Sequence, residues 1–227
     1  MYKYEMHCHT AESSRCSHIS AADLVDCYKK MGYDAIVVTD HFFNNGSSVA
    51  PKDLPWNERV SMLLGGYKAA LARGTEVGID VHLGWEVTHR GTDLLTYGLD
   101  ENWLLRHEDC DLLTLNDYCD LVHESGGYMV HAHPFREADY IEYIRLLPRK
   151  VDAVETINAC RTEFENKMAN QYADSYSLPK ICGSDNHRGY QERVAALLLD
   201  FKAENSAEIM KAVMENRHKR EIYDVLL

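Results

Sequence analysis

A chain of 227 residues can bury a substantial core, and we expect a single domain over residues 1–227. Its formal net charge of -12 provides no basic footprint, so we expect no stable nucleic-acid partner. The cysteines form no C-x-x-C pair, no apolar run is long enough to span a bilayer and no signal peptide is visible, so we expect a cytoplasmic protein without a membrane partner.

Short apolar runs alternate with helical patterns along the chain. In chain order they predict a strand at 4–8, a helix at 21–31, a strand at 35–39, a helix at 58–72, strands at 79–87 and 94–97, a helix at 115–124, strands at 128–131, 153–157 and 180–182, and a helix at 207–216. Further helices are expected ahead of the last two strands, and segment 44–55 predicts a loop beside the functional site. This alternation indicates a parallel sheet, either open or closed into a barrel.

Histidines and carboxylates gather at the carboxyl ends of five predicted strands. They are His7 with His9, His41, Glu86, His133, and Asp185 with His187. A lone strand-end histidine is usually only a hydrogen-bonded polar residue, but the carboxyl ends of parallel strands converge on one face, where sites are built. Residues i and i+2 of a strand point to the same side, so His7 and His9 can bind one ion together. Imidazole and carboxylate ligands suit zinc, manganese or iron, and Glu86 could bridge two ions.

The order of these motifs resembles that of a known family. H-x-H, T-D-H, a glutamate, A-H-P and G-S-D-x-H, running from His7 to His187, are similar to the motifs of the polymerase and histidinol phosphatase (PHP) superfamily. The resemblance implies an α/β fold, a distorted TIM-like barrel with seven strands. It also implies two or three divalent metal ions (zinc, manganese or iron) and the hydrolysis of phosphate esters.

Carried over by position, the resemblance implies three metal sites. The first ion would take His7, His9, Glu86 and Asp185, the second would share Glu86 and take His133, and the third would take His41 and His187. Many relatives have a histidine where this chain offers Asp93, which we include as a candidate ligand of the second ion.

The first loop, residues 10–20, is expected to complete the third site. Glu12, Cys16 and His18 are its candidates, and Glu12 is preferred because it is charged and lies closest to His9 in the sequence. Asp40 is expected to orient a ligand imidazole rather than to bind metal.

The sequence therefore predicts a metal-dependent phosphoesterase that attacks a small phosphorylated substrate, a phosphomonoester or a phosphodiester, with a metal-activated water. His41 or Asp185 could protonate the leaving group. Arg136, which follows A-H-P-F, is the best placed to bind the phosphate, and Arg15 and Arg188 also lie in strand-end loops.

Two alternatives stay open. A metal-dependent amidohydrolase could use the same ligand types for C–N hydrolysis, although such enzymes often carry a carbamylated strand-end lysine and the predicted strand ends here contain none. The chain could also be a metal-binding accessory domain without turnover. The sequence identifies neither the substrate nor the oligomeric state.

Overall fold

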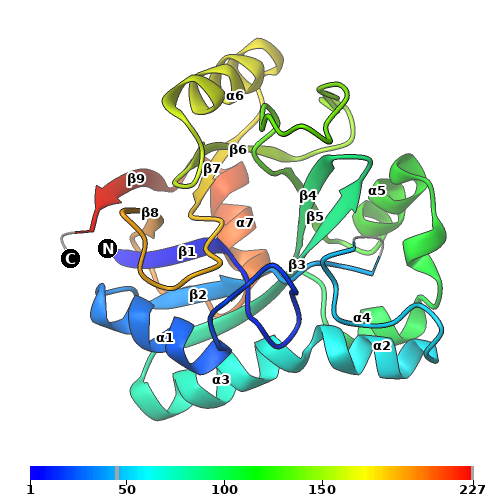
Figure 1. Cartoon of the computed structure of the whole chain (residues 1–227). Helices are drawn as coiled ribbons and strands as arrows, with labels where there is room; N and C mark the ends of the chain where they lie inside the picture. The colour runs from blue at the N-terminus through cyan, green and yellow to red at the C-terminus, as the bar shows by residue number, and fades with distance from the viewer. Residues whose placement is uncertain (44–45, 226–227) are drawn as a thin grey trace.

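The computed structural model describes residues 1–43 and 46–225 and arranges their strands in one nine-stranded sheet (Figure 1). The strands are β1 (Tyr2–Cys8), β2 (Ala35–Val38), β3 (Asp80–His89), β4 (Thr92–Tyr97), β5 (Tyr128–His131), β6 (Ala153–Asn158), β7 (Lys180–Gly183), β8 (Arg193–Leu199) and β9 (Lys219–Asp224). Their spatial order is β7-β6-β5-β4-β3-β2-β1-β8-β9. The expectation of seven strands is therefore wrong, because β8 and β9 extend the sheet beyond β1.

The sheet is mixed rather than parallel. The pairs β1–β2, β2–β3, β5–β6 and β6–β7 are parallel, whereas β4 and β8 run antiparallel to both of their neighbours. The tight turn at Arg90 and Gly91, which have φ of 50° and 79°, explains the reversal between β3 and β4. Two successive positive φ values are typical of the hairpin turns that join antiparallel strands.

The sheet curves into a nearly closed barrel. The backbone N–H of His9 donates to the Asn186 carbonyl at 2.9 Å, and the N–H of Asn186 donates to the His7 carbonyl at 3.2 Å. The segment after β7 therefore pairs with the end of β1, although these strands lie far apart in the sheet order. This closure brings the carboxyl ends of β1 and β7 together.

The helices are α1 (Ala21–Lys30), α2 (Trp56–Leu63), α3 (Gly65–Val77), α4 (Glu101–Arg106), α5 (Leu115–Glu124), α6 (Glu163–Tyr176) and α7 (Ser206–Met214), with a short 3-10 turn at Cys110–Leu112. The single helix expected at 58–72 is divided between α2 and α3. Gly66 lies so close to the loop after β1 that a Cβ there would be 1.9 Å from Thr10 Oγ1, so α3 supports that loop directly. None of the described helices has the length and apolar character needed to cross a membrane.

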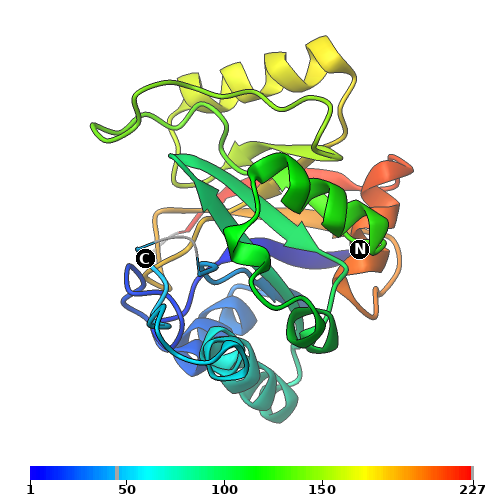
Figure 2. The same cartoon turned by 90° about the vertical axis from the view of Figure 1, so that its right-hand side faces the viewer.

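The connection between β5 and β6 lacks the helix expected ahead of β6, because residues 132–152 contain no helix. Pro134 and Pro148 lie near its two ends, and proline ends or disrupts a helix. The connection is drawn as an irregular loop beside α6 (Figure 2).

The largest apolar cluster joins inward-facing residues of the barrel strands to α7. It includes Tyr4 and Met6 of β1, Leu95 of β4, Val130 of β5, Leu197 of β8, and Ile209 and Met210 of α7, all at most 1% exposed. Burial on this scale holds the strands rigidly. The strand ends therefore form a fixed platform for the polar groups that follow them.

Candidate metal centre

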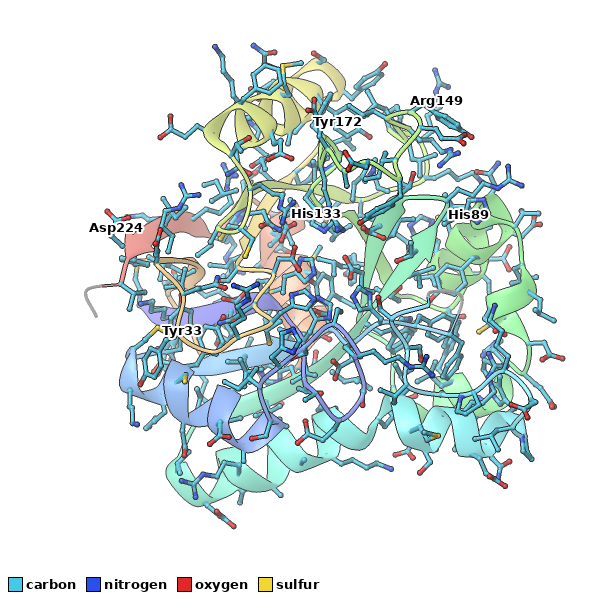
Figure 3. The ribbon with its side chains drawn as sticks, in the orientation of Figure 1. Tyr33, His89, His133, Arg149, Tyr172 and Asp224 are labelled. Carbon is cyan, nitrogen blue, oxygen red and sulfur yellow. The ribbon has the colours of Figure 1, made fainter. Side chains whose placement is uncertain are left out.

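The structure brings the histidines and carboxylates of five strand ends into one buried cluster. They form three groups whose ligand atoms lie within 4.8 Å of one another: His9, His41 and His187; His7, His9 and Asp185; and His7, Glu86 and His133. We call these residues the ligand cluster. In Figure 3 the labelled His133 lies among side chains at the centre of the molecule.

Glu86 lies between the other members of the ligand cluster. Its Oε1 is 3.4 Å from Nε2 of His7 and 3.4 Å from Nε2 of His133, and its Oε2 is 2.9 Å from Nδ1 of His41. Oε1 is buried and has no hydrogen-bond partner among the described residues. This position is the one expected of a carboxylate that bridges two cations.

The ring of His7 is oriented by Glu155, a fully buried residue of β6. Oε1 of Glu155 lies 3.0 Å from Nδ1 of His7, which leaves Nε2 of His7 to face Nε2 of His9 at 3.1 Å. Oε2 of Glu155 accepts from the His133 backbone N–H at 3.0 Å and from Nδ2 of Asn158 at 2.9 Å. A carboxylate behind a ligand histidine fixes its tautomer and its orientation. Glu155 was not among the residues predicted from the sequence.

The electrostatics of the cluster keep its two carboxylates ionised and His9 neutral, as metal ligands require, whereas the carboxylates raise the pKa of His7 and His133 against the effect of burial. Burial opposes ionisation of Glu86, but neighbouring imidazoles, above all those of His41 and His7, hold its pKa well below the usual range. Burial likewise opposes ionisation of Asp185, and the imidazole of His7 holds its pKa well below the usual range. Burial and the rings of His187 and His41 keep the pKa of His9 well below that of an ordinary histidine.

This donor set fits divalent cations. Buried polar atoms are nearly always hydrogen-bonded in folded proteins, yet Oε1 of Glu86, Nδ1 of His9 and Oδ1 of Asp93 have no hydrogen-bond partner among the described residues. Ionised carboxylates and neutral imidazoles are the ligands that zinc and related ions prefer.

Two members of the ligand cluster have strained backbones. His133 has a φ of 25° and Asp185 a φ of 51°, in the left-handed region that residues other than glycine rarely adopt. Such conformations cost about 1–3 kcal/mol each and tend to occur where function requires them. The strain aims both side chains at the cluster from the ends of β5 and β7.

The first loop places its three candidate ligands differently. Both carboxylate oxygens of Glu12 accept from the backbone N–H of Ala21, at 3.0 and 2.9 Å, so Glu12 caps α1 and lies outside the three groups. Cys16 instead forms hydrogen bonds with His187 and His41. Burial opposes ionisation of the Cys16 thiol, but these two bonds outweigh it and lower its pKa to about 6. The geometry therefore favours Cys16 over Glu12. His18 is exposed.

Asp40 was expected to orient a ligand imidazole, but in the described part of the chain its carboxylate binds the first loop instead. Its carboxylate accepts from the backbone N–H and the hydroxyl of Thr10 and from the hydroxyl of Ser14, each at 2.7 Å. Oγ of Ser14 in turn accepts from the His41 backbone N–H at 3.0 Å. Burial raises the pKa of Asp40 to about 6 despite these donors. Asp40 therefore holds the first loop against the strand end that carries His41.

A cavity of about 780 Å³ opens beside the ligand cluster. Among the described residues, it is lined by Cys16, His18, His41, Gly46, Ser47, Glu86, Thr88, Arg90, Gly91, Asp93, His133, Arg136, Tyr140, Cys160, Arg161, Asp185, His187, Arg188 and Gln191. Gly46 and Ser47 belong to the loop expected at 44–55, of which residues 44 and 45 lie outside the described residues.

The predicted phosphate-binding arginines are not all at this cavity. Arg136 and Arg188 line it, whereas Arg15 is exposed and does not. Nη1 of Arg136 is 3.3 Å from Oδ2 of Asp93, and that oxygen is 4.0 Å from Nε2 of His133. Arg136 therefore lies at the edge of the ligand cluster. Arg90 and Arg161 also line the cavity, and neither was predicted from the sequence.

No protein-family model matches the chain, and no curated protein matches its sequence. The fold is similar to that of a two-domain protein from Bacteroides vulgatus that contains a predicted PHP-like metal-dependent phosphoesterase: the TM-score is 0.69 at 18% identity, over 97% of this chain and 64% of that one. A predicted metal-dependent phosphoesterase from Bifidobacterium adolescentis gives a TM-score of 0.53 at 14% identity, over 81% of this chain and 87% of that one. An amidohydrolase from Chromobacterium violaceum, with bound sulfate, gives a TM-score of 0.58 at 14% identity, over 96% of this chain and 97% of that one.

The chain therefore has the fold of PHP-like metal-dependent phosphoesterases, in agreement with the motif resemblance. It spans about two thirds of the Bacteroides protein. At 14–18% sequence identity, the similarity to these structures shows a shared fold and nothing further.

Proposed function

We propose that the protein is a metal-dependent phosphoesterase whose residues 1–227 act as one catalytic domain on a small phosphomonoester or phosphodiester. The observation that carries this proposal is the ligand cluster beside a cavity that is lined, among the described residues, by four arginines and no lysine. The cluster suits divalent cations, and arginine suits phosphate because its planar fork makes bidentate contacts.

The ligand cluster has places for two or three ions of zinc, manganese or iron. We assign His7, His9 and Asp185 to the first, Glu86 and His133 with His7 to the second, and His41 and His187 with His9 to the third, where Cys16 replaces Glu12 as the ligand from the first loop. Bound ions would supply an activated water at neutral pH and charge stabilisation for the phosphoryl oxygens. Asp93 lies next to the second group, because its Oδ2 is 4.0 Å from Nε2 of His133.

The residues of this chain then bind and orient the ester. Arg136 binds phosphoryl oxygens, and its ion pair with Asp93 sets the direction of the guanidinium. Asp185 is ionised, so it acts as a ligand rather than as the proton donor to the leaving group. His41 has the raised pKa that a donor needs, because Glu86 and Cys16 outweigh the effect of burial. It can donate only while its nitrogen binds no ion.

The amidohydrolase alternative has less support from the cavity. No lysine lines the cavity among the described residues, so nothing there could serve as a carbamylated ligand. Four arginines would be unusual around a neutral amide, whereas they match the charge of a phosphate ester.

The test compares para-nitrophenyl phosphate with para-nitroacetanilide on protein loaded with manganese or zinc. We expect nitrophenol release from the phosphate and no nitroaniline release from the amide. Hydrolysis of the amide alone would replace this proposal with the amidohydrolase. Full metal loading without turnover on phosphate monoesters or diesters would support an accessory domain instead.

A further inference from the structure

Four arginines from four different segments line the cavity beside the ligand cluster. Arg90 is in the turn between β3 and β4, and Arg136, Arg161 and Arg188 follow β5, β6 and β7. The cavity volume of about 780 Å³ is in the range that accommodates a whole small-molecule ligand rather than a single phosphate.

Three of the four guanidinium groups have no hydrogen bond or ion pair within the part of the chain that the structure describes. Only Arg136 is engaged, with Asp93 and with the hydroxyl of Tyr140. Nε of Arg161 is buried without a partner. This is unexpected in a protein with 36 acidic and 24 basic residues.

Arginines elsewhere in the protein pair with carboxylates. Arg59 lies against Asp111, and Arg73 makes two bonds of 2.9 Å to Asp26. Arg90 and Arg188 are exposed, whereas Arg161 is partly buried and its Nε is buried without a partner among the described residues. A buried donor without a partner is costly unless a ligand satisfies it. Arg161 therefore indicates an anionic ligand in the cavity, and Arg188 lines the same cavity.

The four arginines of the cavity form two sets according to their positions. Arg90 and Arg136 lie at the β3–β5 side of the ligand cluster, where Arg136 contacts Asp93. Arg161 and Arg188 follow β6 and β7, which are neighbours in the sheet. Each guanidinium carries five N–H donors. The oxygens of one phosphate, shared with the ligand cluster and Arg136, cannot satisfy this many donors.

We propose that the substrate carries a second anionic group, a phosphate or a carboxylate, at a distance from the ester that is hydrolysed, and that Arg161 and Arg188 bind it. This inference rests on the proposed phosphoesterase activity and specifies its substrate class. The scissile phosphate lies over the ligand cluster beside Arg136, and the remainder of the molecule extends through the cavity towards β6 and β7.

The experiment uses phosphate esters of primary alcohols that differ in the second group. Propyl phosphate, the phosphate ester of 3-hydroxypropionate and the bisphosphates of propanediol and hexanediol are compared by kcat/KM on the metal-loaded protein. We expect at least one bis-anionic ester to exceed propyl phosphate by about 10- to 100-fold, the value of a charge-assisted contact. The carboxylate and phosphate arms distinguish the two chemistries, and the linkers measure the distance.

Arg161→Ala and Arg188→Ala should each remove most of this preference. Arg149→Ala is the matched control: Arg149 is exposed and, like them, unpaired among the described residues, but it does not line the cavity and lies at the periphery in Figure 3. It should keep the full preference. Metal content and circular dichroism verify that each variant is folded and loaded.

Equal kcat/KM for all esters in the parent would overturn the inference and leave the phosphoesterase intact, since propyl phosphate would still be hydrolysed. If no ester is hydrolysed, the proposed function fails, and calorimetry then tests the second anion separately. Propane bisphosphonate should bind more tightly than propylphosphonate, and Arg161→Ala should abolish the difference. Equal binding of the two phosphonates would overturn the inference as well.

Discussion

Replacing Glu155 with glutamine should weaken metal binding without changing the ligand cluster itself. The new amide side chain would have one oxygen and one NH₂ group where the parent has two acceptors. Placed at Oε2, the NH₂ group would face two donors, the His133 N–H and Nδ2 of Asn158. Placed at Oε1, it would face only Nδ1 of His7. The second arrangement is therefore the less costly one.

In that arrangement the proton of His7 moves to Nε2, the nitrogen that faces the ligand cluster. Loss of a carboxylate behind a ligand histidine typically lowers metal affinity by about 10- to 100-fold, or about 1.4–2.7 kcal/mol. Zinc affinity is measured by competition with a chromophoric chelator, beside circular dichroism and Tm. Glu12→Gln is the control and should bind zinc as the parent does, because Glu12 caps α1. A Glu155→Gln protein with the zinc affinity of the parent would refute the reasoning.

Three further variants test individual members of the site. Glu86→Gln should lose at least one metal equivalent and all detectable turnover while circular dichroism is unchanged, because a neutral amide bridges cations poorly; activity close to that of the parent would exclude a bridge. Arg136→Ala should reduce kcat/KM on phosphate esters by about 10- to 100-fold at constant metal content, with partial recovery in Arg136→Lys. Unchanged kinetics would assign Arg136 only to its pair with Asp93. Cobalt-loaded parent protein should show a near-ultraviolet sulfur-to-metal charge-transfer band that Cys16→Ser lacks and Cys160→Ser retains. Cys160 lines the same cavity, but its thiol donates to the Asp185 backbone carbonyl and to the Gln191 side chain rather than contacting a ligand imidazole. A band that survives in Cys16→Ser would exclude Cys16 as a ligand.

The ligand cluster was accessible from the sequence because strand geometry is local. Once a buried strand ending at position 8 is recognised, alternation places His7 and His9 on one side, and parallel neighbours bring Glu86 and Asp185 to the same edge. Glu155 carried a weaker signal that was not used. A glutamate within the apolar run of β6 must have a buried partner.

The choice between Glu12 and Cys16 depends on contacts that are distant in the sequence. The first loop is fixed by Asp40 and by the bond from the Arg15 N–H to the Ser47 carbonyl, at 2.7 Å. Residue spacing contains no information on such contacts. Charge and proximity to His9 favoured Glu12, but its carboxylate satisfies the exposed N-terminus of α1 instead.

The predicted number of strands and their predicted parallel direction were wrong for a different reason. The apolar run of β8 was present in the sequence, but the barrel expected from the resemblance was complete without it. The β3–β4 reversal depends on the turn at Arg90 and Gly91, whose positive φ values the dipeptide alone does not specify. Alternation of strands and helices therefore predicted the α/β class and missed the antiparallel pairs.

Phosphate release before and after removal of metal tests the central claim most directly. Protein stripped by a chelator and then titrated with manganese or zinc is assayed on an aryl phosphate, with bound metal measured in the same samples. We expect no turnover in the stripped protein and a rise with metal that levels off at about two or three ions per chain. A folded protein that binds these ions and hydrolyses no phosphate ester, or one that is equally active without metal, would contradict the account.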